Sequence, residues 1–365
     1  MQKPWPVLLM AQELGLGGSE RQLAEMARAL DRTCFEVHVG CFRAGGFRQE
    51  ELRAAGMPVV QFPVRSFRSP SALSGAWQMG RYLRRHQVQL VHTFDVPTNL
   101  YGVPVARAFR TPVVVSSQRA HRDLTPGWRR RLLRVTDRMV DAVVVNSRAV
   151  QRQLVEEDGV AAAKIRLCHN GVDTGVFRTP GLRRGSLVIG VICALRPEKD
   201  LSTLLEAFAK VRRLRAGLRL VIVGDGPSEQ SLKKHSQELG LGEDCHFEPA
   251  TNRVLDWLRA IDIFVLPSLS ESFSNALMEA MACGCAVVAS GVGGNPELVS
   301  HEQTGLLFRP GDPDDLAECL RLLIDDEALR KRLAEAAVRL IQEHYSLETA
   351  ARRMGEIYSA LLAAR

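Results

Sequence analysis

The chain has 365 residues, 46% of them hydrophobic, and a formal net charge of +7. This length and composition predict a globular protein of two or three domains with sizeable cores. No apolar run approaches the roughly 20 residues of a membrane-spanning helix, and the N-terminal residues lack the apolar core of a signal peptide. We therefore expect a cytoplasmic protein, either soluble or peripheral on the inner face of the membrane.

Short apolar runs that read as strands alternate with helical patterns along the chain. Most of these runs are continuously apolar, as expected for parallel strands covered by helices on both faces. The pattern predicts two successive α/β domains, residues 1–180 and 181–345, with a linker at 179–185. The expected strands are 7–10, 37–40, 59–62, 90–93, 113–117, 142–146, 165–168, 187–194, 218–223, 263–266 and 286–290.

A glycine-rich loop, residues 15–18, follows the first expected strand and leads into a helix. Ser19 and Gln22 fit a capping box at the start of this helix. A glycine loop before a helix lets a ligand phosphate approach backbone amides. A dinucleotide-binding fingerprint is a weak alternative, because Glu20 stands where a third glycine is needed and no acidic residue closes the second strand. A plain turn is the other alternative.

Two histidines follow expected strands, at the edge where ligands of open α/β sheets bind. His121 lies just past the strand 113–117, and His92 ends the strand 90–93. A single histidine is more often structural than functional, but its position makes His121 a candidate. His92 is a lesser candidate, for a place facing an acceptor.

The first half of the chain is strongly basic. Residues 1–180 hold 26 Lys and Arg against 15 Asp and Glu, whereas 181–365 hold 22 against 26. Basic helical patterns at 128–138 and 81–86 are either solvated charged faces or surfaces for anionic lipid headgroups. No motif or series of stacking aromatics supports nucleic-acid binding.

In the second half, the loop 195–200 follows the strand 187–194 and contains Arg196 and Lys199. Basic groups at the carboxyl end of a strand can clamp a diphosphate. Acidic residues would be the usual choice next to a helix start, so this pattern favours a binding role.

The segment from Pro267 to Gly284 is the centre of the prediction. It follows the buried strand 263–266 and becomes helical near Ser274, which suits an N-cap. Glu271 stands in the loop and Glu279 eight residues later. The free amides between them suit a phosphate, whereas the carboxylates accept hydrogen bonds from hydroxyls. A nucleotide sugar has this layout, although Glu279 is also compatible with a solvated or capping helix acid.

The Glu-x7-Glu pattern at 271 and 279 resembles that of retaining glycosyltransferase family 4, which has the GT-B fold. Asn-Gly-Val-Asp at 170–173 and Gly-Asp-Gly-Pro at 224–227 are also similar to that family. The resemblance implies two Rossmann-like, doubly wound domains facing a cleft, with a last segment, 346–365, that crosses back to the first domain. It also implies transfer of a sugar from a nucleotide-sugar donor to a glycan or lipid-linked acceptor, without a metal or other cofactor.

The resemblance also implies roles for individual residues. The sequence departs from the family pattern in two segments. Ala194 stands at the usual Arg position, so the side chain of Arg196 would have to reach back to that place. In the segment expected to frame the nucleotide base, Pro249 replaces the usual Gly and Thr251 replaces a frequent Arg. The implied catalytic residues are His121 and Glu271 at the donor sugar and Lys199 and Arg196 at the diphosphate. The implied donor-binding residues are Gly17, Gly18, Ser272, Phe273, Ser274, Asn275 and, at the ribose, Glu279.

Other functions remain possible at this point. A nucleotide-sugar epimerase shares the fold, and a non-catalytic sugar-binding or membrane-surface protein would keep the basic helices. Asp312 and Asp314 spell the Asp-x-Asp of metal-dependent transferases, but acids at a helix start serve the dipole, which favours a cap over a metal site. The eight cysteines include no CxxC pair, so we expect free thiols.

Overall fold

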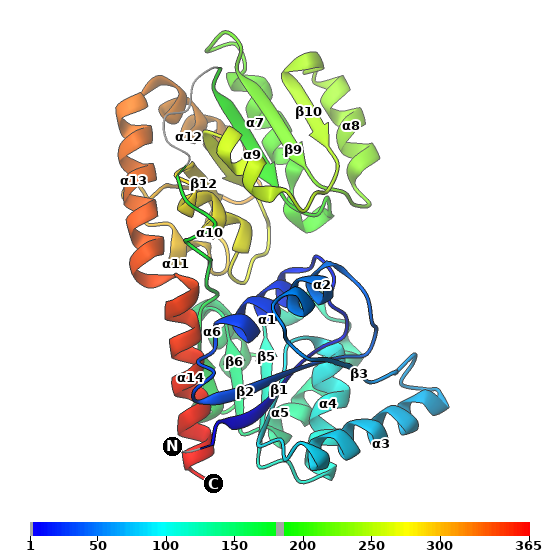
Figure 1. Cartoon of the computed structure of the whole chain (residues 1–365). Coiled ribbons are helices and arrows are strands. Elements are labelled where there is room, and N and C mark those ends of the chain that lie inside the picture. The colour runs from blue at the N-terminus through cyan, green and yellow to red at the C-terminus, as the bar shows by residue number, and fades with distance from the viewer. Residues whose placement is uncertain (1–2, 180–185) are drawn as a thin grey trace. The chain divides into compact units, whose positions relative to one another are not determined.

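The computed structural model describes residues 3–179 and 186–365, and it divides into two compact units (Figure 1). Unit 1 comprises residues 1–171 and 347–365, and unit 2 comprises 172–346. The chain thus passes between the units at 171/172 and 346/347, whereas the sequence predicted boundaries at 180/181 and 345/346. Residues 180–185 of the predicted linker lie outside the described residues.

Unit 1 is built on a parallel seven-stranded sheet in the order β3-β2-β1-β4-β5-β6-β7. Leu9 of β1 pairs with Val39 of β2 and His92 of β4, which fixes the register at the centre. The strands are β1 (Trp5–Ala11), β2 (Phe35–Cys41), β3 (Val59–Gln61), β4 (Leu90–Thr93), β5 (Val113–Gln118), β6 (Ala142–Val145) and β7 (Ile165–Leu167). The helices are α1 (Gly18–Ala29), α2 (Phe47–Ala54), α3 (Pro70–Arg85), α4 (Val96–Ala108), α5 (Gly127–Met139), α6 (Arg148–Glu156) and α14 (Leu347–Ala363), with 3-10 turns η1 (Arg122–Leu124) and η2 (Ala162–Lys164).

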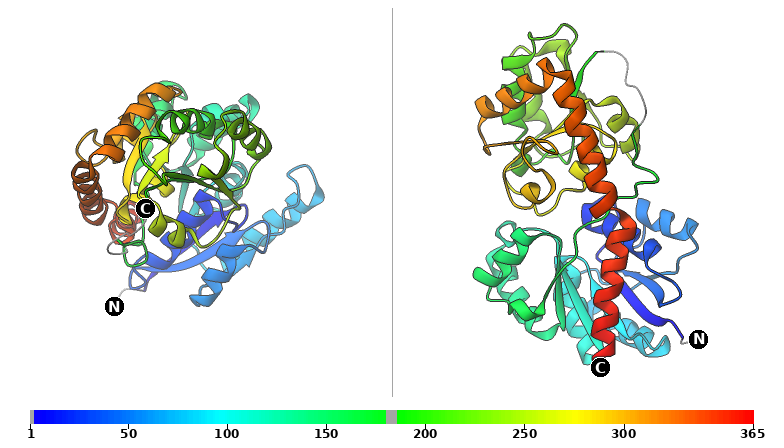
Figure 2. Two further views of the ribbon diagram at one scale, coloured as in Figure 1. Left: turned by 90° about the horizontal axis from the view of Figure 1, so that it is seen from above. Right: turned by 90° about the vertical axis from the view of Figure 1, so that its left-hand side faces the viewer.

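Helices cover both faces of this sheet, as continuously apolar strands require. One face packs against α1, α2 and α14 through a buried cluster that includes Leu23, Leu52 and Met354. The other face packs against α3, α4 and α6 through a cluster that includes Met79 and Val103. The last helix, α14, lies along unit 1 next to α1 (Figure 2).

Unit 2 is built on a parallel six-stranded sheet in the order β10-β9-β8-β11-β12-β13. Its strands are β8 (Val188–Ile192), β9 (Arg219–Val223), β10 (Cys245–Glu248), β11 (Ile263–Leu266), β12 (Ala286–Ser290) and β13 (Leu306–Phe308). Its helices are α7 (Leu201–Val211), α8 (Glu229–Glu238), α9 (Val254–Ala260), α10 (Asn275–Ala282), α11 (Asn295–Leu298), α12 (Pro313–Asp325) and α13 (Glu327–His344), with 3-10 turns η3 (Pro197–Lys199) and η4 (Gly242–Asp244). β8 and β11 are neighbours in the sheet although 70 residues, 193–262, lie between them in the sequence. The loops that follow these two strands therefore leave the sheet side by side.

The elements agree with the sequence pattern except at three places. β10 and β13, which are short edge strands, were not predicted. The predicted capping box at Ser19 is wrong, because α1 begins at Gly18 with Gly17 as N-cap and without a side-chain cap.

All eight cysteines are free thiols, as expected. Among residues 3–179 and 186–365, no helix has the length and apolar character needed to span a membrane.

Candidate functional site

Lys199 and Glu271 form an ion pair at the carboxyl edge of the unit 2 sheet. Lys199 Nζ donates a hydrogen bond to Glu271 Oε1. Lys199 ends η3, after β8, and Glu271 stands in the loop after β11, so the pair follows from the pairing of these two strands. Burial lowers the pKa of Lys199, but the charge and hydrogen bond of Glu271 outweigh burial and raise it. Lys199 is therefore a cation held at this edge.

The loop that carries Glu271 is fixed by buried hydrogen bonds. Ser268 Oγ donates to Glu271 Oε1 at 3.0 Å, and Ser268 is fully buried. Ser290 Oγ donates to the Ser268 carbonyl at 2.5 Å, and Asn295 Nδ2 donates to the Ser290 carbonyl at 3.1 Å. Sequence reasoning did not assign these residues, although Ser268 follows Pro267 at the start of the central segment. The chain of contacts sets the place of the Glu271 carboxylate.

The start of α10 lies where the sequence predicted it. Ser274 is the N-cap, and its Oγ accepts a hydrogen bond from the Leu277 amide at 3.3 Å. Asn275 begins the helix, Ser272 is half-buried in the loop before it, and Glu279 is 3% exposed on α10. Glu271 and Glu279 therefore flank a capped helix start, which presents backbone amides and a positive dipole end.

Two predicted donor-site residues have unexpected surroundings in unit 2. The Phe273 side chain is buried in the core against Tyr345, with ring centroids 5.5 Å apart, so this side chain does not reach a ligand. The Arg196 side chain is 63% exposed, and its Nη1 lies 4.0 Å from Glu198. Arg196 therefore lies next to Glu198, an acid of its own loop. Ala194, which stands at the position where the family pattern has Arg, is exposed.

In unit 1, the glycine loop carries an acid. A Cβ on Gly17 would lie 2.2 Å from Glu20 Oε2, so the absence of a side chain at Gly17 makes room for this carboxylate. Burial raises the pKa of Glu20, and the charges of Asp95 and Glu13 raise it further. Gly17 and Gly18 still form the start of α1, but a phosphate at these amides requires the Glu20 side chain to turn away.

The two histidine candidates differ in their surroundings. His121 precedes η1 and is half-buried, at the same carboxyl edge of the sheet as the glycine loop. His92 is fully buried, with Nδ1 2.5 Å from Tyr358 Oη and Nε2 2.8 Å from Ser117 Oγ. Burial lowers the pKa of His92 well below its usual value. The prediction that His92 faces an acceptor is wrong, because its ring joins β4 to α14.

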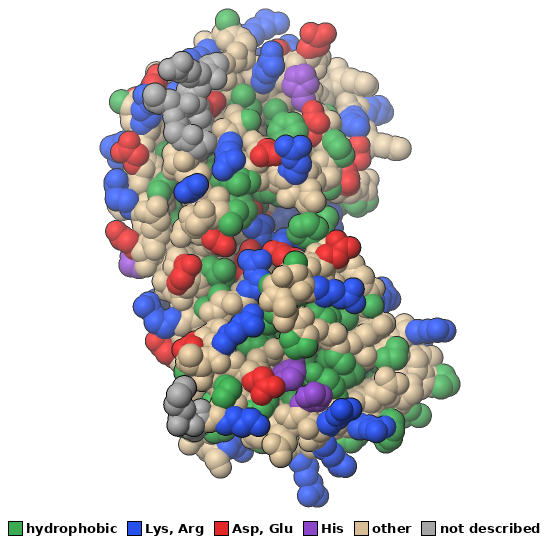
Figure 3. Space-filling model, viewed as in Figure 1, with side chains coloured by type: hydrophobic (Ala, Val, Ile, Leu, Met, Phe, Trp, Pro, Cys, Tyr) green, Lys and Arg blue, Asp and Glu red, His purple; other side chains and the backbone are tan. Residues whose placement is uncertain are grey.

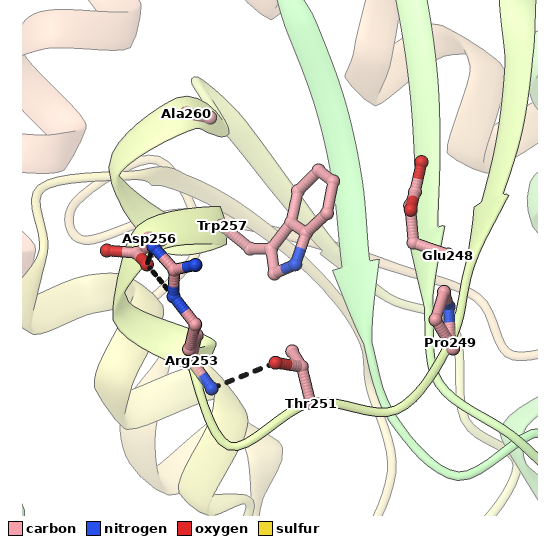
Figure 4. Close-up of a pocket in the computed structure, with 7 residues that line it drawn as sticks. All are labelled: Glu248, Pro249, Thr251, Arg253, Asp256, Trp257 and Ala260. Carbon is pink, nitrogen blue, oxygen red and sulfur yellow. Dashed lines mark hydrogen bonds and ion pairs between the residues drawn. The ribbon is translucent and has the colours of Figure 1, made fainter.

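A pocket of about 420 Å³ lies between the end of β10 and α9. The indole of Trp257 points from α9 into the space between this helix and Glu248 (Figure 4). Arg253 Nε donates to Asp256 Oδ2 at 2.7 Å at the rim. The pocket includes Glu248, Pro249 and Thr251, which belong to the segment that the sequence assigned to a nucleotide base. Trp257 was missed, because a single aromatic on a short helix gives no periodic signal.

The Asp312 side chain caps α12, as the sequence indicated. Its Oδ1 accepts hydrogen bonds from the amides of Asp314 and Asp315, each at 3.0 Å. Over residues 3–179 and 186–365, no group of three or more His, Cys, Asp or Glu side chains is arranged to hold a metal ion.

Comparison with known proteins relates both units to glycosyltransferases. Residues 16–176 match the family described as "Glycosyltransferase Family 4", and residues 176–339 match "Glycosyl transferases group 1". D-inositol 3-phosphate glycosyltransferase from Nocardioides sp. is 30% identical over 343 residues, which cover 86% of this chain and 70% of that protein. The protein of the same name from Streptomyces avermitilis is 30% identical over 288 residues, 72% of this chain, but the match spans only 62% of that relative.

Solved structures support the fold. HepE from Anabaena, in complex with UDP and glucose, superposes with a TM-score of 0.85 at 23% identity and covers 97% of this chain and 99% of its own. Sucrose-phosphate synthase from Thermosynechococcus elongatus superposes with a TM-score of 0.85 at 19% identity. The match covers 99% of this chain and 100% of the synthase chain. With two parallel-sheet Rossmann-like units and a relative at this identity and coverage, the chain belongs to glycosyltransferase family 4 and has the GT-B fold.

Proposed function

We propose that this protein is a retaining glycosyltransferase that moves a sugar from a nucleoside-diphosphate sugar to a hydroxyl of a glycan or lipid-linked acceptor. The observation that carries the proposal is the Lys199–Glu271 ion pair beside the capped start of α10. This arrangement places a cation and the backbone amides of a helix N-terminus next to two carboxylates. A diphosphate suits the cation and the amides, and the flanking sugars suit the carboxylates.

In the proposed reaction, the bond between the sugar anomeric carbon and the donor phosphate oxygen breaks, and the acceptor oxygen bonds to the same face of that carbon. The acceptor proton passes to the leaving phosphate. Lys199 and the α10 amides stabilise the negative charge that develops on the diphosphate, which is electrostatic preorganisation. Because these groups supply the positive charge, we propose that turnover is independent of metal ions and survives chelation by EDTA.

We also propose that the pocket beside Trp257 receives the nucleotide base. Its volume of about 420 Å³ lies within the range of ligand sites, about 300–1,000 Å³, and it is lined by residues of the segment 248–260. An indole face stacks on any base, with about 1–3 kcal/mol lost on removal of the aromatic ring. Trp257→Leu is therefore expected to weaken nucleotide binding roughly tenfold to a hundredfold, measured by calorimetric titration.

Two substitutions test the assigned roles. Glu271→Gln should abolish most transfer while nucleotide binding changes little, because this carboxylate is assigned to the donor sugar. Glu279→Gln should weaken binding of the nucleotide itself, because this carboxylate is assigned to the ribose. The measurements are affinity for UDP, GDP and ADP with their sugars, followed by turnover of the donor that binds best. Equal loss of binding and transfer in both variants contradicts the assignment.

Product analysis separates transfer from epimerisation. A transferase consumes donor only when an acceptor hydroxyl is present and releases the nucleoside diphosphate, and the new bond keeps the anomeric configuration of the donor. Conversion of the donor to a second sugar without an acceptor would instead establish an epimerase. The name of the two relatives mentions D-inositol 3-phosphate, so the acceptor panel should include polyol phosphates beside glycans and lipid-linked acceptors.

A further inference from the structure

One face of unit 1 exposes large apolar side chains on two helices. α3 and α5 each pack against α4, so they lie on the same face of the sheet. Leu73 and Trp77 on α3 are 79% and 59% exposed. Trp128, Leu132 and Val135 on α5 are 57%, 47% and 49% exposed, and their spacing of four and three residues makes one stripe. We call these five side chains and the arginines around them the α3/α5 surface.

The chain segment that forms this surface is almost free of acids. Residues 52–136 hold 14 arginines, no lysine and only two acids, Asp95 and Asp123. Asp95 caps α4, and Asp123 lies 3.4 Å from Arg130. Within residues 3–179 and 186–365, Arg81, Arg129 and Arg131 have no ion-pair partner, although all three are exposed. The surface thus has an uncompensated positive charge.

Aromatic rings and arginines are interleaved on this surface. The Arg81 guanidinium lies 5.5 Å from the centroid of the Trp77 ring, and that of Arg129 lies 5.1 Å from the Trp128 ring. Over α3, at the lower right of Figure 3, hydrophobic and basic side chains lie together. Tryptophan and arginine beside exposed aliphatic groups are typical of helices that lie in the interfacial region of a bilayer.

The opposite side of α5 is held by a buried ion-pair cluster. Arg122 Nη1 and Nη2 donate to the two carboxylate oxygens of Asp137 at 2.8 and 3.0 Å, and both residues are buried. Arg130 Nε and Arg134 Nε donate to Asp158 Oδ1 at 2.7 and 3.1 Å. These contacts fix the rotation of α5 about its axis, so the apolar stripe stays directed outward rather than turning into the core.

We propose that the α3/α5 surface binds an anionic phospholipid bilayer, with the indoles at the headgroup boundary and the arginines on lipid phosphates. A second copy of the chain is a poor occupant, because an isologous contact brings the unpaired arginines of both copies together. Helices that follow parallel strands begin at the carboxyl edge of the sheet, where Gly17 and His121 also lie. If the acceptor is lipid-linked, which rests on the proposed function, the bound membrane presents it near this edge.

Vesicle flotation of the full chain tests the charge contribution. Phosphatidylcholine vesicles with about 30% phosphatidylglycerol should bind the protein, pure phosphatidylcholine should not, and binding should weaken as added salt shortens the Debye length. The variant R81Q/R129Q/R131Q should lose roughly a hundredfold in affinity, since each basic residue near the surface contributes about fivefold. The matched control R32Q/R213Q/R352Q removes three exposed arginines outside the α3/α5 surface and should lose far less.

A second variant tests the apolar contribution. W77S/W128S keeps every charge, and it should lower affinity for the anionic vesicles while the salt dependence remains. Equal loss in both arginine variants, equal binding to neutral vesicles, or concentration-dependent self-association that the tryptophan variant abolishes would each overturn the proposal. Nucleotide affinity of the same variants, measured without lipid, should stay native, so that failure of membrane binding is distinguished from failure of the proposed activity.

Discussion

At the scale of single residues, Ser268 positions the candidate carboxylate of Glu271. Its hydroxyl is buried and donates to Glu271 Oε1 at 3.0 Å. A hydrogen bond to a charged group contributes about 1.5–3 kcal/mol, so Ser268→Ala should lower kcat roughly tenfold or more while KM for the donor changes little. The control is Ser270→Ala in the same loop, where the side chain is half-buried and makes no hydrogen bond to residues 3–179 or 186–365. A rise in KM with kcat intact would contradict a positioning role.

Individual site residues could be predicted from sequence only where local pattern decides their environment. The Ser274 cap and the Glu271 loop follow from the strand before them and the helix after them. The burial of His92 depends on Tyr358, which is 266 residues away in sequence, and no local pattern contains that contact. Likewise, the core position of Phe273 depends on Tyr345. Long-range packing therefore accounts for the wrong or incomplete residue assignments.

At the scale of elements, continuous apolar runs were sufficient to predict the central strands of both sheets. β4, β11 and β12 have the predicted bounds, because each is buried on both faces. The unpredicted strands, β10 and β13, are edge strands of three or four residues. Edge strands bury fewer side chains, so their sequences carry a weaker apolar signal.

Tyr358 makes a polar contact within the largely apolar interface between α14 and the rest of unit 1. Tyr358 is fully buried, lies 5.8 Å from the Phe35 ring centroid and shares a hydrogen bond with His92 Nδ1. Tyr358→Phe leaves that nitrogen without its partner, which should cost about 1–3 kcal/mol and lower the melting temperature of unit 1 by roughly 2–4 °C per kcal/mol. Thermal unfolding followed by circular dichroism measures the shift.

The matched control for this prediction is Ser359→Ala. Ser359 is the next residue of α14 and is exposed, so its substitution should leave the melting temperature within about 1 °C, in line with the small effects of surface changes. An unchanged melting temperature in Tyr358→Phe would mean that the apolar contacts of α14 suffice and that the His92 contact adds no stability.

At the scale of the whole molecule, the two units have separate cores and opposite charges. Each of the buried clusters among the described residues draws on one unit: two on unit 1 and two on unit 2. Unit 1 holds 28 Lys and Arg against 16 Asp and Glu, a charge of +12, whereas unit 2 holds 20 against 25, a charge of −5. The excess of positive charge therefore resides in the unit that carries the α3/α5 surface.

Separate cores predict two calorimetric transitions that respond to different perturbations. Nucleotide at 100 times its dissociation constant should stabilise the unit it binds by about 2.7 kcal/mol, and the proposed site predicts that only the temperature of the unit 2 transition rises.

Acid should instead destabilise unit 1. Burial lowers the pKa of His92 and of His38, so the unfolded chain takes up protons below about pH 6.5 that the folded unit does not.

The sign of the acid effect follows from this difference in proton uptake. Stability from His92 is present above its unfolded pKa and is lost as the pH falls below about 6.5, by up to about 1.4 kcal/mol per pH unit. Burial raises the pKa of Glu25 and Asp95 in the same unit, which acts in the opposite direction, so the reference is His92→Gln. The unit 1 transition of the native chain should fall more steeply with acid than that of His92→Gln, while the unit 2 transition is the same in both. One transition that moves as a whole with nucleotide and with acid would show instead that the two cores unfold cooperatively.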